Sequence, residues 1–262
     1  MIPPAYVTEW RRHAPWPTDE QVEHDLIITR VLVDVFGRPG LRESLAFRGG
    51  TALAKLYLPA HRYSEDIDLV QLRAEPIGAT LNAIREVLDP WLGAPSWKRS
   101  HASVKLIYRL TLGFDSGSRR KLKLEINTRE HKPVFGLTTQ ILILDSRWYA
   151  GSAPITTYSL DELLATKLRA LYQRKKGRDL YDLVTAMTNA DVDPQRVVDG
   201  FVMYLAREGL SVSRAEFEAN LAEKAQDADF LADVVAVVAD GTDYDVVDAA
   251  RQVQESLIAR LP

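Results

Sequence analysis

Residues 48–70 read RGGTALAKLYLPAHRYSEDIDLV, and this stretch carries the strongest signal in the chain. Gly49 and Gly50 open a helical pattern, and a strand follows that holds Asp66 and Asp68 around a single apolar residue. Because strand side chains alternate between two faces, both carboxylates point the same way, roughly 7 Å apart. Like charges held side by side repel each other, so this arrangement indicates a cation between them.

A phosphate seat is expected next to the two carboxylates. Mg²⁺ prefers oxygen ligands and leaves positions open for phosphate oxygens. A Gly-Gly turn that opens a helix presents bare N–H groups to an anion. We therefore expect Gly49, Gly50 and Thr51 to bind the β and γ phosphates of a nucleoside triphosphate. An Asp-x-Asp pair alone is a weak signal, since such pairs are common on solvated edges. Its place inside an apolar strand strengthens it.

A third carboxylate is expected on a neighbouring strand. Residues 103–113 and 121–127 alternate in polarity, and the residues between them (DSGS, 115–118) predict a turn, so the two segments predict an antiparallel pair. Glu125 lies between two apolar residues of the second strand. Three carboxylates on adjoining strands form a template for two metal ions.

Glu125 also has a simpler interpretation, as a solvated residue paired with Lys105 or Lys123. Two residues before the aspartates are similarly open to two readings. Ser64 could donate to a phosphate or cap the strand entry, and Arg62 could meet a phosphate or fix the loop.

Composition limits the function further. The 262 residues are 46% hydrophobic and 26% charged, as in an ordinary globular protein. The absence of cysteine excludes zinc–thiolate sites, disulfides and a cysteine nucleophile. No apolar run reaches about 18 residues, so no membrane contact is expected and the predicted location is cytoplasmic. The net charge of −3 requires any nucleic-acid surface to be local.

The order of patterns predicts an α+β fold. Helices are expected over 17–36 and over 77–93, the latter broken at Pro90. From Ser159, where a capping box with Glu162 begins a helix, only helical patterns follow. We therefore predict a mixed sheet with flanking helices over residues 1–153 and a helical domain over 154–262, separated by a linker at 150–158.

The helical half contains its own candidate site, at residues 167–182. Lys167 lies on the apolar stripe of its helix, where a lysine needs a partner or a ligand phosphate. Gly177 is expected to end that helix. Asp179 and Asp182 would then cap the next helix or position Lys167 or Arg178.

Basic clusters offer a path for RNA. Residues 119–123 (with Arg119, Arg120, Lys121 and Lys123) and 174–176 (Arg174, Lys175 and Lys176) could contact a phosphate backbone, or could be solvated turns. The acidic C-terminal end is expected to be a solvated helical face. It comprises Asp227, Asp229, Asp233, Asp240, Asp243, Asp245 and Asp248.

Three motifs together resemble the nucleotidyltransferase toxins of the AbiEii/AbiGii type, which include the mycobacterial MenT toxins and belong to the DNA polymerase β superfamily. The motifs are Gly-Gly-Thr-Ala-Leu, Arg-x-Ser-Glu-Asp-Ile-Asp-Leu and Lys-x-Arg-Ala…Arg-Asp-x-x-Asp, within residues 48–182. Many superfamily members have Gly-Ser where this chain has Gly49-Gly50, so a hydroxyl contact there would have to come from Thr51.

The resemblance implies a polymerase-β-type nucleotidyltransferase domain followed by a helical domain. It assigns Gly49, Gly50, Asp66 and Asp68 to the first motif of the superfamily. It assigns the second motif of the family to the helical domain, at residues Lys167, Arg178, Asp179 and Asp182. It also implies a toxin with a cognate antitoxin, and a tRNA 3′ end as acceptor.

The predicted reaction is Mg²⁺-dependent transfer of a nucleoside monophosphate from a triphosphate to an acceptor hydroxyl. Asp66, Asp68 and Glu125 would hold two metal ions and, with Lys167, form the catalytic group. The remaining candidates would bind substrate: Gly49, Gly50, Thr51, Arg62, Ser64, Arg178, Asp179 and Asp182. The alternatives are a small-molecule or protein acceptor, or a relative without catalysis that binds RNA or protein.

Overall fold

The computed structural model describes residues 2–113, 119–239 and 241–262; the turn predicted at 115–118 lies outside them. The chain divides into two compact units, Met1–Tyr158 and Ser159–Pro262. The first holds a mixed sheet with flanking helices, and the second is helical, which confirms the predicted α+β class. No helix of the described part of the chain is both long and apolar enough to span a membrane.

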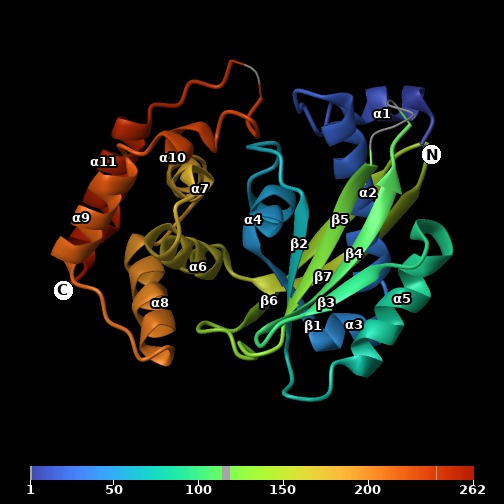
Figure 1. Cartoon of the computed structure of the whole chain (residues 1–262), viewed down its shortest axis with the longest axis horizontal. Helices are drawn as coiled ribbons and strands as arrows, with labels where there is room; N and C mark the ends of the chain where they lie inside the picture. Colours follow the sequence, from blue (N-terminus) through green and yellow to red (C-terminus); the bar gives the residue numbers. More distant parts are fainter. Residues whose placement is uncertain (1, 114–118, 240) are drawn as a thin grey trace. The chain divides into compact units, whose positions relative to one another are not determined.

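A seven-stranded sheet organises the first unit, in the order β3-β4-β5-β2-β1-β7-β6 (Figure 1). β2 is central, antiparallel to β1 and parallel to β5. The strands are β1 (Leu45–Arg48), β2 (Asp66–Gln71), β3 (Ser96–Arg99), β4 (Ser103–Thr111), β5 (Arg119–Asn127), β6 (Leu137–Asp145) and β7 (Ala150–Tyr158).

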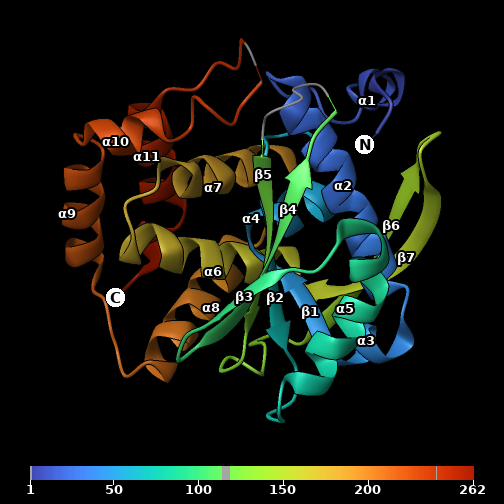
Figure 2. The same ribbon diagram turned by 45° about the vertical axis from the view of Figure 1, so that its right-hand side comes forward.

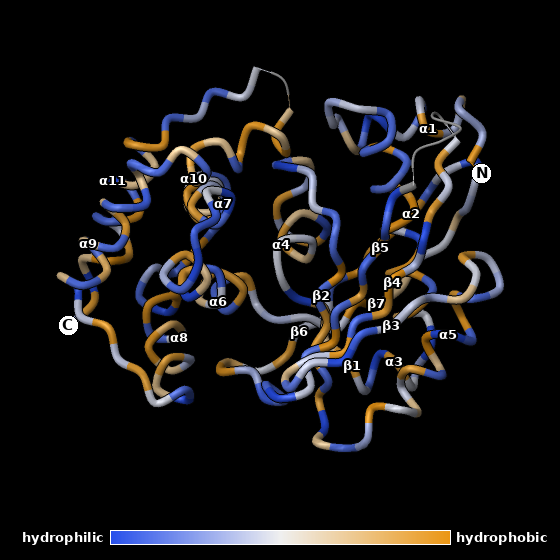
Figure 3. The backbone as a smooth tube through the Cα atoms, in the orientation of Figure 1, coloured by the Kyte–Doolittle hydropathy of each residue, from blue (hydrophilic) through white to orange (hydrophobic). Residues whose placement is uncertain are grey.

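Alternation along β4 and β5 decides which face of the sheet is buried. The two strands pair antiparallel, as predicted. Every second residue of each strand is buried, and Figure 3 shows short apolar and polar segments alternating along them. Helices α2 (Asp19–Phe36) and α5 (Gly78–Leu92) lie on the apolar side (Figures 1 and 2). The polar side chains of β2, β4 and β5 consequently share the other face.

Two helices of this unit test the sequence predictions. α2 begins after Thr18, whose hydroxyl accepts from the backbone of Gln21 in a reciprocal capping box. The expected break at Pro90 is wrong, because α5 continues through it to Leu92. Pro90 lies in the last turn, so it interrupts the backbone ladder only near the end of the helix, and Gly93 ends the helix with a φ of +78°.

β7 replaces the linker that was expected at residues 150–158. The segment pairs with β6 along its whole length, and with β1 only at Thr157. Pro154 therefore lies where one edge of the strand is open, which a residue without an N–H tolerates. The boundary between the two units follows β7 instead of cutting it at 153/154. β3 was also missed, because its four residues are all exposed and show no alternation.

Short helical segments complete the first unit. The Gly-Gly turn forms α4, and a single π-helical stretch follows it directly. These segments are α1 (Pro4–Trp10), α3 (Pro39–Ser44), α4 (Gly49–Ala52) and the π-helical residues Leu53–Tyr57.

The second unit consists of α6 (Leu160–Gln173), α7 (Gly177–Asn189), α8 (Pro194–Arg207), α9 (Arg214–Lys224), α10 (Ala228–Ala232), α11 (Val246–Ser256) and a 3-10 turn at Ile258–Arg260. Ser159 caps α6, as predicted, by accepting from the backbone N–H of Glu162, but the Glu162 side chain accepts from the Tyr204 hydroxyl at 2.6 Å rather than completing the predicted capping box. Gly177 begins α7 rather than ending α6. A side chain there would collide with the carbonyl of Phe230 in α10, so glycine permits this close approach.

Candidate functional site

The aspartate pair lies on the polar face of the sheet, at the start of β2. Asp66 and Asp68 are partly exposed, while Ile67 between them is buried on the opposite face. The Oδ1 atom of Asp66 is buried, and no described donor forms a hydrogen bond with it. It lies 3.2 Å from Nζ of Lys123 on β5. This oxygen is close to the Lys123 ammonium group but accepts no hydrogen bond, so a lone pair is available to a metal cation.

The glycines fit closely around the second aspartate. Gly49 has a φ of +81°, which favours glycine, and a side chain there would overlap the carboxylate of Asp68. A side chain at Gly50 would overlap the guanidinium of Arg62. Because the two residues lack a Cβ atom, the backbone passes directly beside the Asp68 carboxylate at Gly49 and beside the Arg62 guanidinium at Gly50.

A row of charged residues crosses four strands at the level of Asp68. In register, Arg48 on β1 is opposite Asp68, Asp68 is opposite Glu125 on β5, and Glu125 is opposite Lys105 on β4. Register partners share a face, so the signs run plus, minus, minus, plus. Arg48 also pairs with Glu130; burial opposes its charge, but this carboxylate raises the pKa of Arg48. The row places two carboxylates side by side between two cations.

Glu125 is held by protein groups. Its Oε2 lies 2.7 Å from Nζ of Lys105, and its Oε1 accepts from the Ser103 hydroxyl at 2.7 Å. The hydrogen bond to Glu125 raises the pKa of Lys105. Among the described residues, no three His, Asp or Glu side chains are grouped so that they could hold a metal ion. The three-carboxylate cluster expected from the sequence is therefore not formed, and Glu125 adopts the alternative ion pair.

The hydroxyl groups near the pair bind the protein itself. Thr51 is buried, and its Oγ1 contacts Ser64 Oγ at 2.8 Å and donates to the carbonyl of Asp66. Arg62 is buried and donates to the carbonyl of Tyr63 at 2.9 Å. These contacts join the Gly-Gly turn to β2. They favour the structural alternative for Ser64 and Arg62, and leave Thr51 turned away from solvent.

A cavity of about 420 Å³ opens on this face of the sheet. Its lining combines two of the carboxylates with four cations, and Ser100 and Ile107 complete it. The charged lining residues are Asp66, Glu125, Lys98, Arg99, Lys105 and Lys123. A space with this lining suits a phosphorylated ligand, since anionic oxygens meet cations beside the carboxylates.

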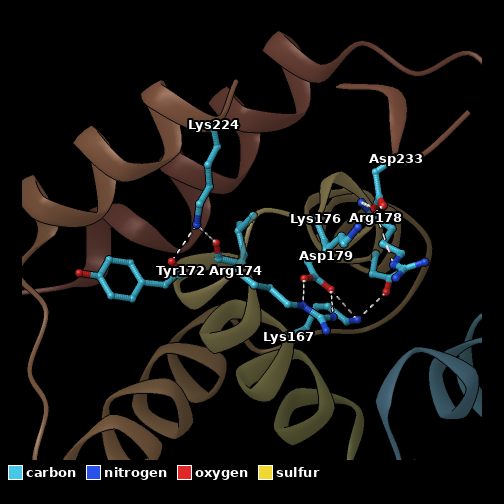
Figure 4. A network of polar contacts seen from close by, with 10 residues as sticks. Lys167, Tyr172, Arg174, Lys176, Arg178, Asp179, Lys224 and Asp233 are labelled. Carbon is cyan, nitrogen blue, oxygen red and sulfur yellow. Dashed lines mark hydrogen bonds and ion pairs between the residues drawn. The ribbon is translucent and has the colours of Figure 1, made fainter. Parts of the chain in front are cut away.

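The second predicted constellation forms a buried ion cluster inside the helical unit (Figure 4). Lys167 is 5% exposed, and its Nζ lies 2.9 Å from Asp179 and 2.9 Å from Asp182, both fully buried. Arg174 adds two hydrogen bonds to Asp179 at 2.7 and 2.8 Å. Burial opposes the charge of Asp179, but Lys167 and Arg174 hold its pKa below the ordinary value. The inward lysine thus has carboxylate partners within its own unit.

The rest of the 174–178 segment is neutralised by the acidic end of the chain. Lys175 pairs with Asp227 at 3.1 Å, and Lys176 pairs with Asp233 at 3.3 Å. Arg178 lies 3.7 Å from the same Asp233 (Figure 4). Binding of RNA at this cluster would therefore compete with ion pairs inside the protein. The expectation of a purely solvated acidic face is wrong for these two aspartates, which also cap α10 and α7.

The other basic cluster is also partly engaged. Arg120 pairs with Glu20 of α2, and Lys123 with Asp66. Lys98 and Arg99 line the cavity but were missed, because β3 was not predicted. The residues Trp97-Lys98-Arg99 could have revealed it as a basic strand with an aromatic residue.

Comparison with solved structures shows the fold. The chain is similar to MenT4, a nucleotidyltransferase toxin from Mycobacterium tuberculosis, with a TM-score of 0.70 and 17% identity over 100% of this chain and 91% of that one. It is also similar to a putative nucleotidyltransferase from Helicobacter pylori, with a TM-score of 0.55 and 16% identity over 91% and 93% of the two chains. Comparison with curated protein sequences gives no match.

The sequence itself matches a family model. The model describes the AbiEii nucleotidyl transferase toxin of type IV toxin–antitoxin systems, and it matches residues 30–253, which is most of the chain and includes both motif regions. This confirms the family resemblance carried by the motifs at residues 48–182. The chain therefore belongs to the AbiEii family of nucleotidyltransferase toxins, and it is a nucleotidyltransferase.

Proposed function

We propose that this nucleotidyltransferase uses Mg²⁺ to transfer a nucleoside monophosphate to the 3′ hydroxyl of an RNA, with tRNA as the expected acceptor. It would act in the cytoplasm, where its triphosphate substrate is found, as the toxin of a pair with a cognate antitoxin. The observation that carries the proposal is the Asp66–Asp68 pair on β2, with the Gly49 turn fitted against it.

The two aspartates fit one hard cation. Asp66 offers a buried carboxylate oxygen that makes no hydrogen bond within the described structure. Asp68 lies two positions further along β2, on the same face. Mg²⁺ is commonly held by one or two carboxylates together with substrate phosphates. A bound ion would neutralise phosphate charge and favour the ionised acceptor hydroxyl. A second ion would need Glu125, whose oxygens already contact Lys105 and Ser103.

The protein groups around the pair have distinct roles in this proposal. Gly49 and Gly50 let the triphosphate approach the backbone, since neither has a side chain. Lys105 and Lys123 offset the charge of the carboxylates and of the phosphates in the cavity. Negative charge that develops on the phosphates during transfer would then be stabilised by cations that are already in position.

The motif that Lys167 and Arg178 match predicts that both residues bind the triphosphate. Asp179 and Asp182 hold the Lys167 amine at 2.9 Å each, so we assign them as positioning residues that fix its orientation.

The test is label transfer from each α-labelled nucleoside triphosphate, with and without Mg²⁺, in the presence of total RNA. Label on RNA that requires Mg²⁺ and disappears in Asp68→Asn supports the proposal. Label on protein or on a small molecule would replace the acceptor class. Expression in bacteria provides a second readout, because the wild-type chain should arrest growth and Asp68→Asn should not.

A further inference from the structure

A second cavity adjoins the candidate site on the first unit. It has a volume of about 370 Å³ and lies at the ends of β3, β4 and β5. Arg99 and Ser100 line both this cavity and the one beside Asp66. His101 and Arg129 continue the lining away from the carboxylates. The two cavities are therefore neighbours that share Arg99 and Ser100 in their linings, and we call the cations Lys98, Arg99 and Arg129 around them the path.

The cations of this path differ from those of the sequence-predicted clusters. Within the described residues, neither Lys98 nor Arg99 forms an ion pair with a carboxylate. The Arg129 guanidinium donates to the carbonyl of His101 (3.1 Å) and contacts its Nε2 (3.3 Å), and neither group is a carboxylate. All three cations are exposed. By contrast, Lys175 and Lys176 each pair with an aspartate.

An unneutralised cation gains more from a phosphate than a paired one, since no existing ion pair must be broken. The chain has a net charge of −3, so attraction of a polyanion has to come from local groups of cations. Cations spaced along a path that ends at the aspartates match a strand of phosphates whose terminus enters the site.

We infer that the margin formed by Lys98, Arg99 and Arg129 binds the backbone of the acceptor RNA strand and leads its 3′ end to Asp66 and Asp68. This inference rests on the proposed RNA acceptor and replaces the 174–176 segment as the RNA path. Arg99, which lines both cavities, is the central contact.

The test compares two variants that each remove two positive charges. Arg99→Ala/Arg129→Ala removes path cations, and the matched control Lys175→Ala/Lys176→Ala removes cations that are paired with aspartates. Binding of a short 5′-fluorescein single-stranded RNA is followed by anisotropy between roughly 50 and 200 mM salt. Each lost phosphate contact on a single strand flattens the slope of log K against log salt by about 0.7.

The path variant should therefore bind more weakly and lose about 1.4 from its slope. The control should keep the wild-type slope, and Arg99→Lys/Arg129→Lys should restore most of the binding. The circular dichroism spectrum and thermal midpoint of the path variant should match those of the wild type, which separates lost RNA binding from misfolding.

Two results would overturn the inference. A wild-type slope in the path variant, with RNA still labelled in the transfer assay, would refute the path and leave the proposed function standing. A wild-type chain that neither binds nor labels RNA, but labels another acceptor, would refute the RNA acceptor and the path together.

Discussion

At the scale of single residues, close approach matters more than residue type. Gly49 is needed because its backbone has a positive φ and because Asp68 fills the space of a Cβ atom. Lys167 is needed because its amine forms ion pairs with two buried aspartates, Asp179 and Asp182. Substitution of either residue should therefore change the stability of the fold, which can be measured separately from activity.

Gly49→Ala is expected to lower stability and nearly abolish transfer. The positive φ costs an alanine about 1–2 kcal/mol, and the collision with Asp68 must be relieved by moving the carboxylate. Thermal unfolding and label transfer measure the two effects. Gly78→Ala is the matched control, because nothing lies within 4 Å of its Cβ position at the start of α5. Equal behaviour of the two variants would contradict the close fit.

Lys167→Met is expected to destabilise the protein by about 3–5 kcal/mol, the range for breaking a buried ion pair from one side. The sequence alone predicts little change, because the methionine retains the apolar stem. The structure overturns that expectation, since Asp179 and Asp182 are fully buried around the amine. Urea unfolding measures the loss, and Lys167→Met/Asp182→Asn should recover part of it.

The pH dependence of this variant gives an independent check. The depressed pKa of Asp179 stabilises the fold above the ordinary value of 3.8, and this contribution is lost as the pH falls through the folded value. Without Lys167 the pKa of Asp179 rises, so the variant should lose stability at a higher pH than the wild type. Acid unfolding curves that coincide after correction for the neutral-pH difference would argue against the ion cluster.

At the scale of elements, the register of β2 with β5 decides how the third carboxylate is used. Alternation along β5 predicted that Glu125 would face the same side as Asp68, and the register confirms it. It did not predict that β4 would place Lys105 and Ser103 on the two oxygens of Glu125. With both oxygens in contact with protein groups, the Glu125 carboxylate balances the positive charge of Lys105 and is less available to bind a metal ion.

Glu125→Gln should therefore reduce transfer by about tenfold, far less than Asp68→Asn. Loss of one strong electrostatic stabiliser costs about 10²–10³ in rate, and we expect that cost only at the aspartates. Rates at saturating Mg²⁺ measure the difference. Ser103→Ala is a control that removes one contact of Glu125 and keeps its charge. Equal losses for Glu125→Gln and Asp68→Asn would return Glu125 to the metal site.

At the scale of the whole molecule, the described cations differ in whether they have an acidic partner. The acidic C-terminal end neutralises the cations that follow α6, while the cations at the margin of β3 have no acidic partner within the described chain. The sheet unit therefore carries the features that would attract a nucleotide and an RNA.

Mg²⁺ together with a non-hydrolysable triphosphate should raise the thermal midpoint of the wild type by about 5–10 °C. A ligand at 100 times its Kd adds about 2.7 kcal/mol to a folded state, and a unit of this size gains a few degrees per kcal/mol. Asp66→Asn/Asp68→Asn should show little of this shift, although it folds. Differential scanning calorimetry measures both proteins. An equal shift in the double variant would mean that the nucleotide binds elsewhere.

Features of the fold that depend on local sequence patterns could be predicted from the sequence. Alternation fixed the buried faces of β4 and β5, capping residues fixed the starts of α2 and α6, and the spacing of Asp66 and Asp68 fixed their common face. These features depend on neighbours within a few residues, so one chain is enough to predict them.

Which charges meet depends on how the elements pack. The sequence offered Lys105 or Lys123 for Glu125, and Asp179 and Asp182 for Lys167, but it could not choose among these alternatives. Asp233, the partner of Lys176, lies 57 residues away, so no spacing along the chain could reveal it. β7 became a strand because β6 and β1 supply its hydrogen bonds, although its composition is that of a linker. The energy of an ion pair depends on the distance between its two charges. Burial of apolar surface is the main force that brings the segments together, so it also sets these distances.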